Sequence, residues 1–230
     1  MDEKHYKNNE NYFSKKYILR PLGAVMGILG FLIYFMAWNY VFYILMSIFI
    51  PGGIVLFIIG SVGNSSESDL TDMIEEKTIG LEVRFEEDKY RATRLLVFGF
   101  TPVTHEGHVY KDGLMFKKAK SGTLRTSEYT KAIVYPLNDG LYITRRDFSL
   151  VEDKVENTVY DIPYEELGAI EIVRERRRFY FNKKSFEAKI TEVLISRGEE
   201  TISLPIHDDI TADEYVEKLN KLIAEKKAEI

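Results

Sequence analysis

Residues 21–63, PLGAVMGILGFLIYFMAWNYVFYILMSIFIPGGIVLFIIGSVG, contain no Asp, Glu, Lys, Arg or His. One helix of this length would be about 65 Å long at about 1.5 Å per residue, roughly twice the thickness of the hydrocarbon core of a bilayer. The stretch is therefore predicted to turn back on itself. The turn is expected at Asn39, because its neighbours Trp38 and Tyr40 are amphipathic aromatic residues that prefer the headgroup level. The sequence predicts a hairpin of two membrane-spanning helices over residues 17–63.

Basic residues next to the first helix decide the expected orientation. Lys15, Lys16 and Arg20 adjoin its start, whereas the turn carries no charge. Positively charged flanks stay on the cytoplasmic side, and the acidic flank that follows the second helix has little weight in this rule. We expect a multi-pass protein of the cell membrane with both termini in the cytoplasm. A cleaved signal peptide is the alternative for the first helix, and the second span that follows at once argues against it.

Small residues indicate how the two helices pack. The helices are expected at about residues 17–37 and 40–62. Glycines four residues apart form a small-xxx-small face on the first, and a Pro-Gly-Gly sequence interrupts the second. These residues either pack and kink the hairpin or form a hinge or an oligomer contact. They are Gly23, Gly27, Pro51, Gly52 and Gly53.

The rest of the chain is acidic and contains no cysteine. The whole chain has 31 Lys and Arg against 36 Asp and Glu. This charge argues against general nucleic-acid binding, and the lack of Cys excludes disulfides and Cys-based metal sites. Before the hairpin, residues 1–16 form a polar tail that is expected to be poorly ordered. After it we distinguish a linker at 64–80, a β segment at 81–129 and a final domain at 130–230.

Two helices are predicted outside the hairpin from capping boxes and apolar periodicity. Ser66 and Asp69 form one capping box, and Thr211 and Glu214 form another. Apolar residues at helical spacing follow each box. The helices are expected over residues 67–78 and from residue 211 to about 229.

Strands are predicted between these two helices. Asp-Gly pairs within residues 111–113 and 138–140 favour tight turns, since Gly supplies a positive φ. Many strands followed by one amphipathic helix favour an α+β fold of mainly β content, a curved sheet or open barrel capped by the C-terminal helix. The strands are expected at residues 81–85, 94–101, 108–116, 123–136, 141–150, 158–163, 169–174, 187–196 and 201–206.

Local sequence phrases add a resemblance over residues 130–223. They are GLYITRR at 140–146, YDIPYEELGAI at 160–170, and a strand pair across 197–199 that leads to the final helix. This order is similar to that of the bacterial PH-like domains of the pleckstrin homology and GRAM group. The resemblance implies a seven-strand barrel with a capping helix, often attached to a membrane, that binds or scaffolds and has no catalytic residues.

A basic cluster stands out in the acidic domain. Residues 174–184, RERRRFYFNKK, hold six basic and three aromatic residues. Near an anionic leaflet each basic residue contributes up to about 1 kcal/mol, and the aromatic residues enter the interfacial zone. The alternative is a solvated strand face with its aromatic residues in the core. The expected lipid- or partner-binding residues are Arg174, Arg176, Arg177, Arg178, Tyr180, Lys183 and Lys184. A second basic group, either facing the same membrane or forming an exposed loop, consists of Lys111, Lys117, Lys118, Lys120 and Arg125.

The sequence predicts a non-enzymatic protein without a cofactor or bound metal. It would be anchored in the membrane and bind anionic lipid headgroups or a protein partner at the cytoplasmic face. One alternative is a subunit of a larger transport, secretion or envelope complex. Another is a hydrolase that uses His105, His108 or His207. Residues 105–108, HEGH, lack the helical spacing of a zinc motif, and His207 is expected in a loop before the last helix.

Overall fold

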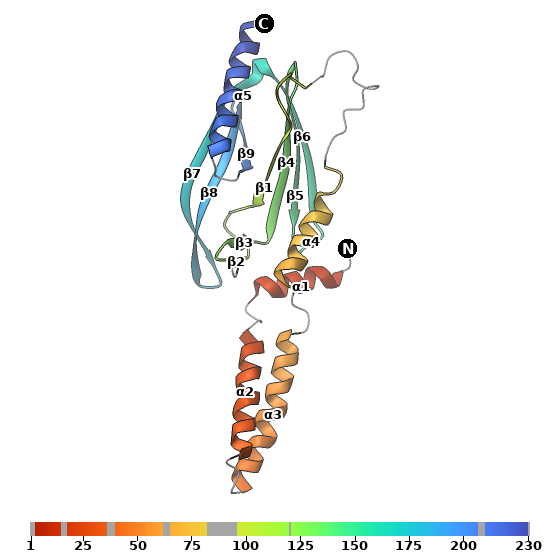
Figure 1. Cartoon of the computed structure of the whole chain (residues 1–230), viewed down its shortest axis with the longest axis vertical. Helices are drawn as coiled ribbons and strands as arrows, with labels where there is room; N and C mark the ends of the chain where they lie inside the picture. The colour runs from red at the N-terminus through yellow and green to blue at the C-terminus, as the bar shows by residue number, and fades with distance from the viewer. Residues whose placement is uncertain are drawn as a thin grey trace. The chain divides into compact units, whose positions relative to one another are not determined.

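The structure is a computed structural model that describes residues 3–14, 18–35, 40–61, 65–81, 96–119, 121–206 and 210–229. The described chain is α+β (Figure 1). It divides into two compact units, which we describe separately. The helical unit comprises Met1–Asp72 and Leu150–Glu152, and the β unit comprises Met73–Ser149 and Asp153–Ile230.

The N-terminal segment, expected to be poorly ordered, contains a helix, α1 (Glu3–Phe13). Its buried side chains include Tyr6, Tyr12 and Phe13. The amide of Asn9 is also buried, and its Nδ2 donates a hydrogen bond of 2.7 Å to the carbonyl of Leu150. Sequence reasoning missed this helix because its composition is polar and rich in Asn. Only a few aromatic residues supply most of its buried surface.

Two apolar helices follow, α2 (Leu19–Phe35) and α3 (Tyr40–Ser61). By length and composition α3 is able to cross a membrane, whereas α2 is a shorter apolar helix. The two helices pack side by side (Figure 1). A Cβ atom added at Gly23 would lie 2.6 Å from the carbonyl oxygen of Gly53. The backbones therefore approach too closely at this level to admit any larger residue.

The glycine contacts between α2 and α3 differ in part from the predicted set. Gly27 has open space where its Cβ would be, and a Cβ at Gly52 would make an ordinary contact. Instead, Gly30 and Gly60 face the opposite helix closely. Gly23 with Gly30, and Gly53 with Gly60, recur every seven residues, a spacing typical of nearly antiparallel packing at a small crossing angle. Pro51 does not interrupt the helix, because α3 continues on both sides of it.

The next helix, α4 (Glu67–Thr78), confirms the prediction. Its capping box is reciprocal: the Ser66 amide donates to Asp69 Oδ2 over 2.7 Å, and the Asp69 amide donates to Ser66 Oγ over 3.2 Å. At the other end, Nη1 of Arg146 donates to the carbonyls of Lys77 and Ile79 over 2.7 and 3.0 Å. A side chain from a strand thus pairs carbonyls that a helix end leaves without partners.

The strands of the β unit form three antiparallel groups. A four-stranded sheet has the order β1-β4-β5-β6, a three-stranded sheet has the order β7-β8-β9, and β2 pairs with β3. The strands are β1 (Val103–His108), β2 (Phe116–Lys118), β3 (Leu124–Thr126), β4 (Glu128–Pro136), β5 (Gly140–Ser149), β6 (Val155–Pro163), β7 (Leu167–Phe181), β8 (Lys184–Arg197) and β9 (Glu200–Pro205).

The predictions for the first strands need correction. Residues 94–101 and 108–116 were expected as strands, but β1 lies between them, and Phe98 and Gly99 form a turn. The prediction for residues 82–85 lies outside the described residues. Since β1 pairs with β4, the segment 81–129 contributes a strand to the same sheet as the final domain.

Both predicted tight turns are present, but for different reasons. Gly113 has a φ of +88°, as an Asp-Gly turn requires. Gly140 does not have a positive φ; a Cβ there would lie 2.9 Å from the carbonyl carbon of Ile162 in β6. Glycine is needed at this position because two backbones come close together.

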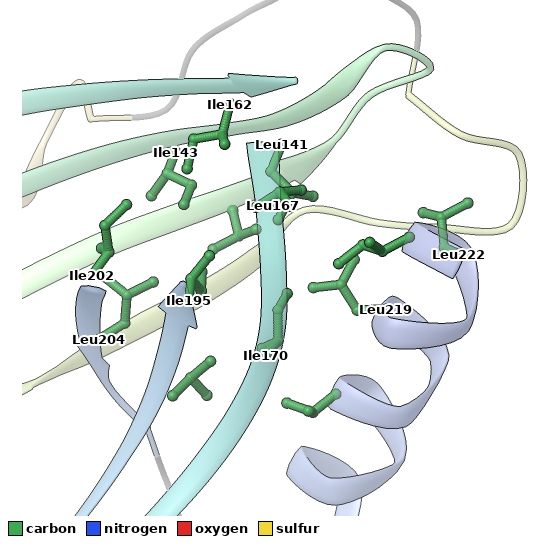
Figure 2. Close-up of a cluster of buried hydrophobic side chains, with 14 of the residues drawn as sticks. Leu141, Ile143, Ile162, Leu167, Ile170, Ile195, Ile202, Leu204, Leu219 and Leu222 are labelled. Carbon is green, nitrogen blue, oxygen red and sulfur yellow. The ribbon is translucent and has the colours of Figure 1, made fainter. Parts of the chain in front are cut away.

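The core lies between the two larger sheets and is closed by α5 (Ile210–Glu229) (Figure 2). Thr211 was expected to be the N-cap of α5. This is wrong, because α5 begins at Ile210 and Thr211 lies inside the helix. The amide of Asn220 fixes α5 to β7: its Oδ1 accepts from the Ile170 N–H over 3.0 Å, and its Nδ2 donates to the Ile170 carbonyl over 2.8 Å. The labelled core residues are Leu141, Ile143, Ile162, Leu167, Ile170, Ile195, Ile202, Leu204, Leu219 and Leu222.

Candidate functional site

The basic cluster lies on the hairpin formed by β7 and β8 (Figure 1). Two residues, Asn182 and Lys183, connect the strands, with φ angles of 50° and 61°. Positive φ at both central residues is typical of a type I′ turn, whose twist matches that of the flanking strands. The register is fixed from the turn, because Phe181 is paired with Lys184.

The turn predicts a stabilising substitution. Lys183 has a left-handed conformation that costs a residue other than Gly about 1 kcal/mol. We expect Lys183→Gly to protect the amides of β7 and β8 more strongly from hydrogen exchange, by several tenths of a kcal/mol. Lys184→Gly is the matched control: it removes the same charge one residue later, within β8, and should weaken protection. Equal effects of the two substitutions would contradict the assigned turn.

One face of the hairpin carries most of the exposed positive charge. Directly paired residues in antiparallel strands lie on the same face, as do residues two apart along a strand. Arg176 pairs with Lys189, Arg178 with Glu187, and Tyr180 follows Arg178 on the same face. We call this surface the basic face, and all these side chains are exposed. Its members are Arg174, Arg176, Arg178, Tyr180, Glu187 and Lys189.

Positive charges lie close together on the basic face. Arg176 lies directly opposite Lys189. Glu187 lies 3.8 Å from Arg176 Nη1, and the Arg174 guanidinium forms an ion pair of 2.7 Å with Asp213 of α5. Residues 174–189 carry seven basic and two acidic residues, a net charge of +5 in a chain whose total is −5. The hairpin therefore carries a local excess of positive charge within an acidic chain.

The aromatic residues of the basic run lie on different faces of the hairpin. Phe179 is buried and stacks on Phe116, with ring centroids 5.2 Å apart. The prediction that both Phe residues enter a membrane interface is therefore wrong for Phe179, whereas Tyr180 is exposed. Arg177 lies on the same face as Phe179, where its exposed side chain forms an ion pair with Glu175. Lys183 and Lys184 lie exposed at the turn.

The second basic group lies against the end of the same hairpin. Phe116 of β2 belongs to one apolar cluster with Phe179, Ala188 and Ile190, so the β2–β3 pair packs on the tip of β7–β8. Lys117 and Arg125 are directly paired on these short strands. In the same group, Lys111 forms an ion pair of 2.6 Å with Glu128, Lys118 is exposed, and Lys120 lies outside the described residues.

Two of the three histidines of the hydrolase alternative, His105 and His108, do not form one site. They lie on β1, not in a loop, and their separation of three residues turns their side chains to opposite faces. Burial lowers the pKa of both His105 and His108 to about 4. Among the described residues no three His, Cys, Asp or Glu side chains are grouped so as to hold a metal ion. His207 lies outside that part of the chain.

Sequence reasoning missed Lys189 of the basic face. It lies outside the basic run, five residues after Lys184. The signal was present: once the turn is centred on Asn182 and Lys183, antiparallel pairing places Lys189 opposite Arg176. Comparisons with protein families, with curated proteins and with solved structures find no match to this chain.

Proposed function

We propose that this chain is a membrane-anchored binding protein whose β unit attaches to anionic lipid headgroups at the cytoplasmic face. The observation that carries the proposal is the basic face, which brings the exposed side chains of Arg176, Arg178 and Lys189 together on one side of the β7–β8 hairpin. Tyr180 adds an exposed aromatic ring beside the charges, which suits the interfacial zone.

The element order supports a PH-like assignment of the β unit. Without the β2–β3 pair, its strands form an antiparallel sheet of four, then one of three, and α5 follows. Seven strands closed by a C-terminal helix are what the sequence resemblance implies. Binding and scaffolding, with no catalytic role, follow from that assignment.

Anchoring rests on the apolar helices. Of the described helices, α3 is long and apolar enough to cross a membrane, and α2 packs along it. We propose that the two helices form a membrane hairpin with both termini in the cytoplasm, because Lys15, Lys16 and Arg20 flank its start. Confinement to the membrane raises the effective concentration of the basic face near headgroups.

The test uses the full chain in nanodiscs of phosphatidylcholine, mixed with larger vesicles that either lack or contain phosphatidylserine. We expect co-sedimentation only with the phosphatidylserine vesicles. The variant Arg176→Ser/Arg178→Ser should bind roughly 30-fold more weakly, since two charges near the surface are worth about 2 kcal/mol.

The matched control is Lys4→Ser/Lys7→Ser, which removes two exposed positive charges from α1. This control should bind as the unchanged protein does. Equal losses in the two variants would show that only net charge matters. Absence of binding to either kind of vesicle would overturn the lipid proposal and leave the basic face as a protein-docking surface.

A further inference from the structure

A fully exposed phenylalanine lies outside the proposed lipid-binding site. The exposed fraction of Phe98 is 101%, the highest among the large hydrophobic residues that the structure describes. Its turn is held in place: the Val97 amide donates to the Pro136 carbonyl over 3.0 Å, and the Phe100 amide donates to the Val97 carbonyl over 3.0 Å. The side chains of Val97 and Phe100 pack on the core. The backbone on both sides of Phe98 is therefore attached to the β unit, while the Phe98 ring projects into solvent.

A groove begins beside Phe98. It has a volume of about 470 Å³ and lies between residues 99–101 and one side of α5. Phe100, Tyr215 and Leu222 give it an aromatic and aliphatic lining. The hydroxyl of Tyr215 is buried and has no hydrogen-bond partner among the residues described here.

Charged residues of α5 line the same groove. Lys221 lies 4.0 Å from Glu225 in an ion pair within the helix. Glu214 and Lys218, one turn apart and exposed, form no such pair with a described residue. If two α5 helices cross antiparallel at this turn, Glu214 of each lies opposite Lys218 of the other. The surface is thus complementary in charge to a second copy of itself.

We propose that this surface is an interface between two copies of the chain, in which Phe98 of each fills the groove of the other. Phe98 and the groove are adjacent on one surface, so a two-fold axis between the copies satisfies both at once and closes the assembly. An exposed aromatic residue that enters a partly apolar groove is a typical interface hot spot. The proposal is independent of lipid binding.

The test is the oligomeric state of the full chain in density-matched micelles, measured by analytical ultracentrifugation over a range of protein concentrations. We expect a concentration-dependent dimer. Phe98→Ser should weaken it about 10- to 100-fold. Ile79→Ser, a change at another exposed apolar residue that does not line the groove, should leave the dimer unchanged.

A charge exchange identifies the arrangement of the two copies. Glu214→Lys and Lys218→Glu should each weaken the dimer, and the double variant should restore it, because the opposed charges are then exchanged. A chain that stays monomeric, or a dimer that survives Phe98→Ser through its apolar helices, overturns the proposal. Failure of the double variant to restore the dimer, with an unchanged circular dichroism spectrum, also overturns it.

Discussion

Acidification from pH 6.5 to pH 4 is expected to remove a large part of the stability of the β unit, through His105 and His108. The imidazole of His105 is buried and that of His108 is half-buried, and desolvation lowers the pKa of each to about 4 from an ordinary value of 6.5. In the unfolded chain they bind protons at about pH 6.5, so the unfolded state takes up more protons below that pH. Stability is therefore fully present above pH 6.5 and is lost as the pH falls toward 4.

The size of this effect follows from the two shifts. Each corresponds to on the order of 3 kcal/mol at pH 4, against a total stability of about 5–15 kcal/mol for a typical domain. We expect the urea midpoint of the full chain in micelles, followed by circular dichroism, to fall steeply between these pH values. His105→Leu should flatten this dependence by about half.

A matched substitution separates this effect from general acid sensitivity. His5 is exposed on α1, so His5→Leu removes an imidazole that is not buried. Its pH profile should follow that of the unchanged protein. A steep profile that persists in His105→Leu, or one that flattens equally in His5→Leu, would disprove the assignment.

Gly23→Ala is expected to separate α2 from α3, whereas Gly27→Ala should not. The added methyl at Gly23 would meet the backbone of α3, including the Gly53 carbonyl oxygen at 2.6 Å, and backbone cannot move aside as a side chain can. Overpacking of this kind costs about 1–3 kcal/mol. Gly27 has open space at the same point, so Ala there is neutral or stabilises the helix by up to about 1 kcal/mol.

The measurement is unfolding of the full chain by a rising fraction of SDS in a mild detergent, with hydrogen exchange read on peptides from α2 and α3. Gly23→Ala should lower the midpoint and expose amides in both helices. Gly53→Ala should do the same from the other side, because its methyl would lie 2.6 Å from the Gly27 amide nitrogen. Identical midpoints for the Gly23 and Gly27 variants would refute the packing described here.

The elements that could be predicted from sequence are those with local signals. The reciprocal bonds of Ser66 and Asp69 are specified by four neighbouring residues, and α4 begins where they predict. β1 was missed because its core-facing positions are Val103, His105 and Gly107, so two of the three residues that should show the alternation are not apolar. Its register comes from pairing with β4, which is a contact between distant parts of the chain.

In the candidate site, too, local features could be predicted from the sequence, whereas features set by contacts between strands could not. Composition alone revealed the basic run, but not which side chains share a face. Arg177 and Phe179 share one face of β7 while Arg176 and Tyr180 share the other, and only the register from the Asn182 turn decides this. Glycine contacts between α2 and α3 were partly predictable from spacing. Gly30, and not Gly27, faces α3 closely because of how α2 is rotated about its axis relative to α3. The sequence of one helix alone does not determine this rotation.

Asn220 has a consequence for how the β unit ends. β7 is the outer strand of its sheet, and such a strand offers free N–H and C=O groups to any other polypeptide. By occupying both groups of Ile170, the amide of Asn220 takes the place of one residue of a neighbouring strand. Beyond it, the closely spaced arginines of β7 repel like-charged copies along the same edge. Amyloid-like growth from the β7 edge is thereby opposed by the hydrogen bonds of Asn220 at Ile170 and by positive charge farther along the strand.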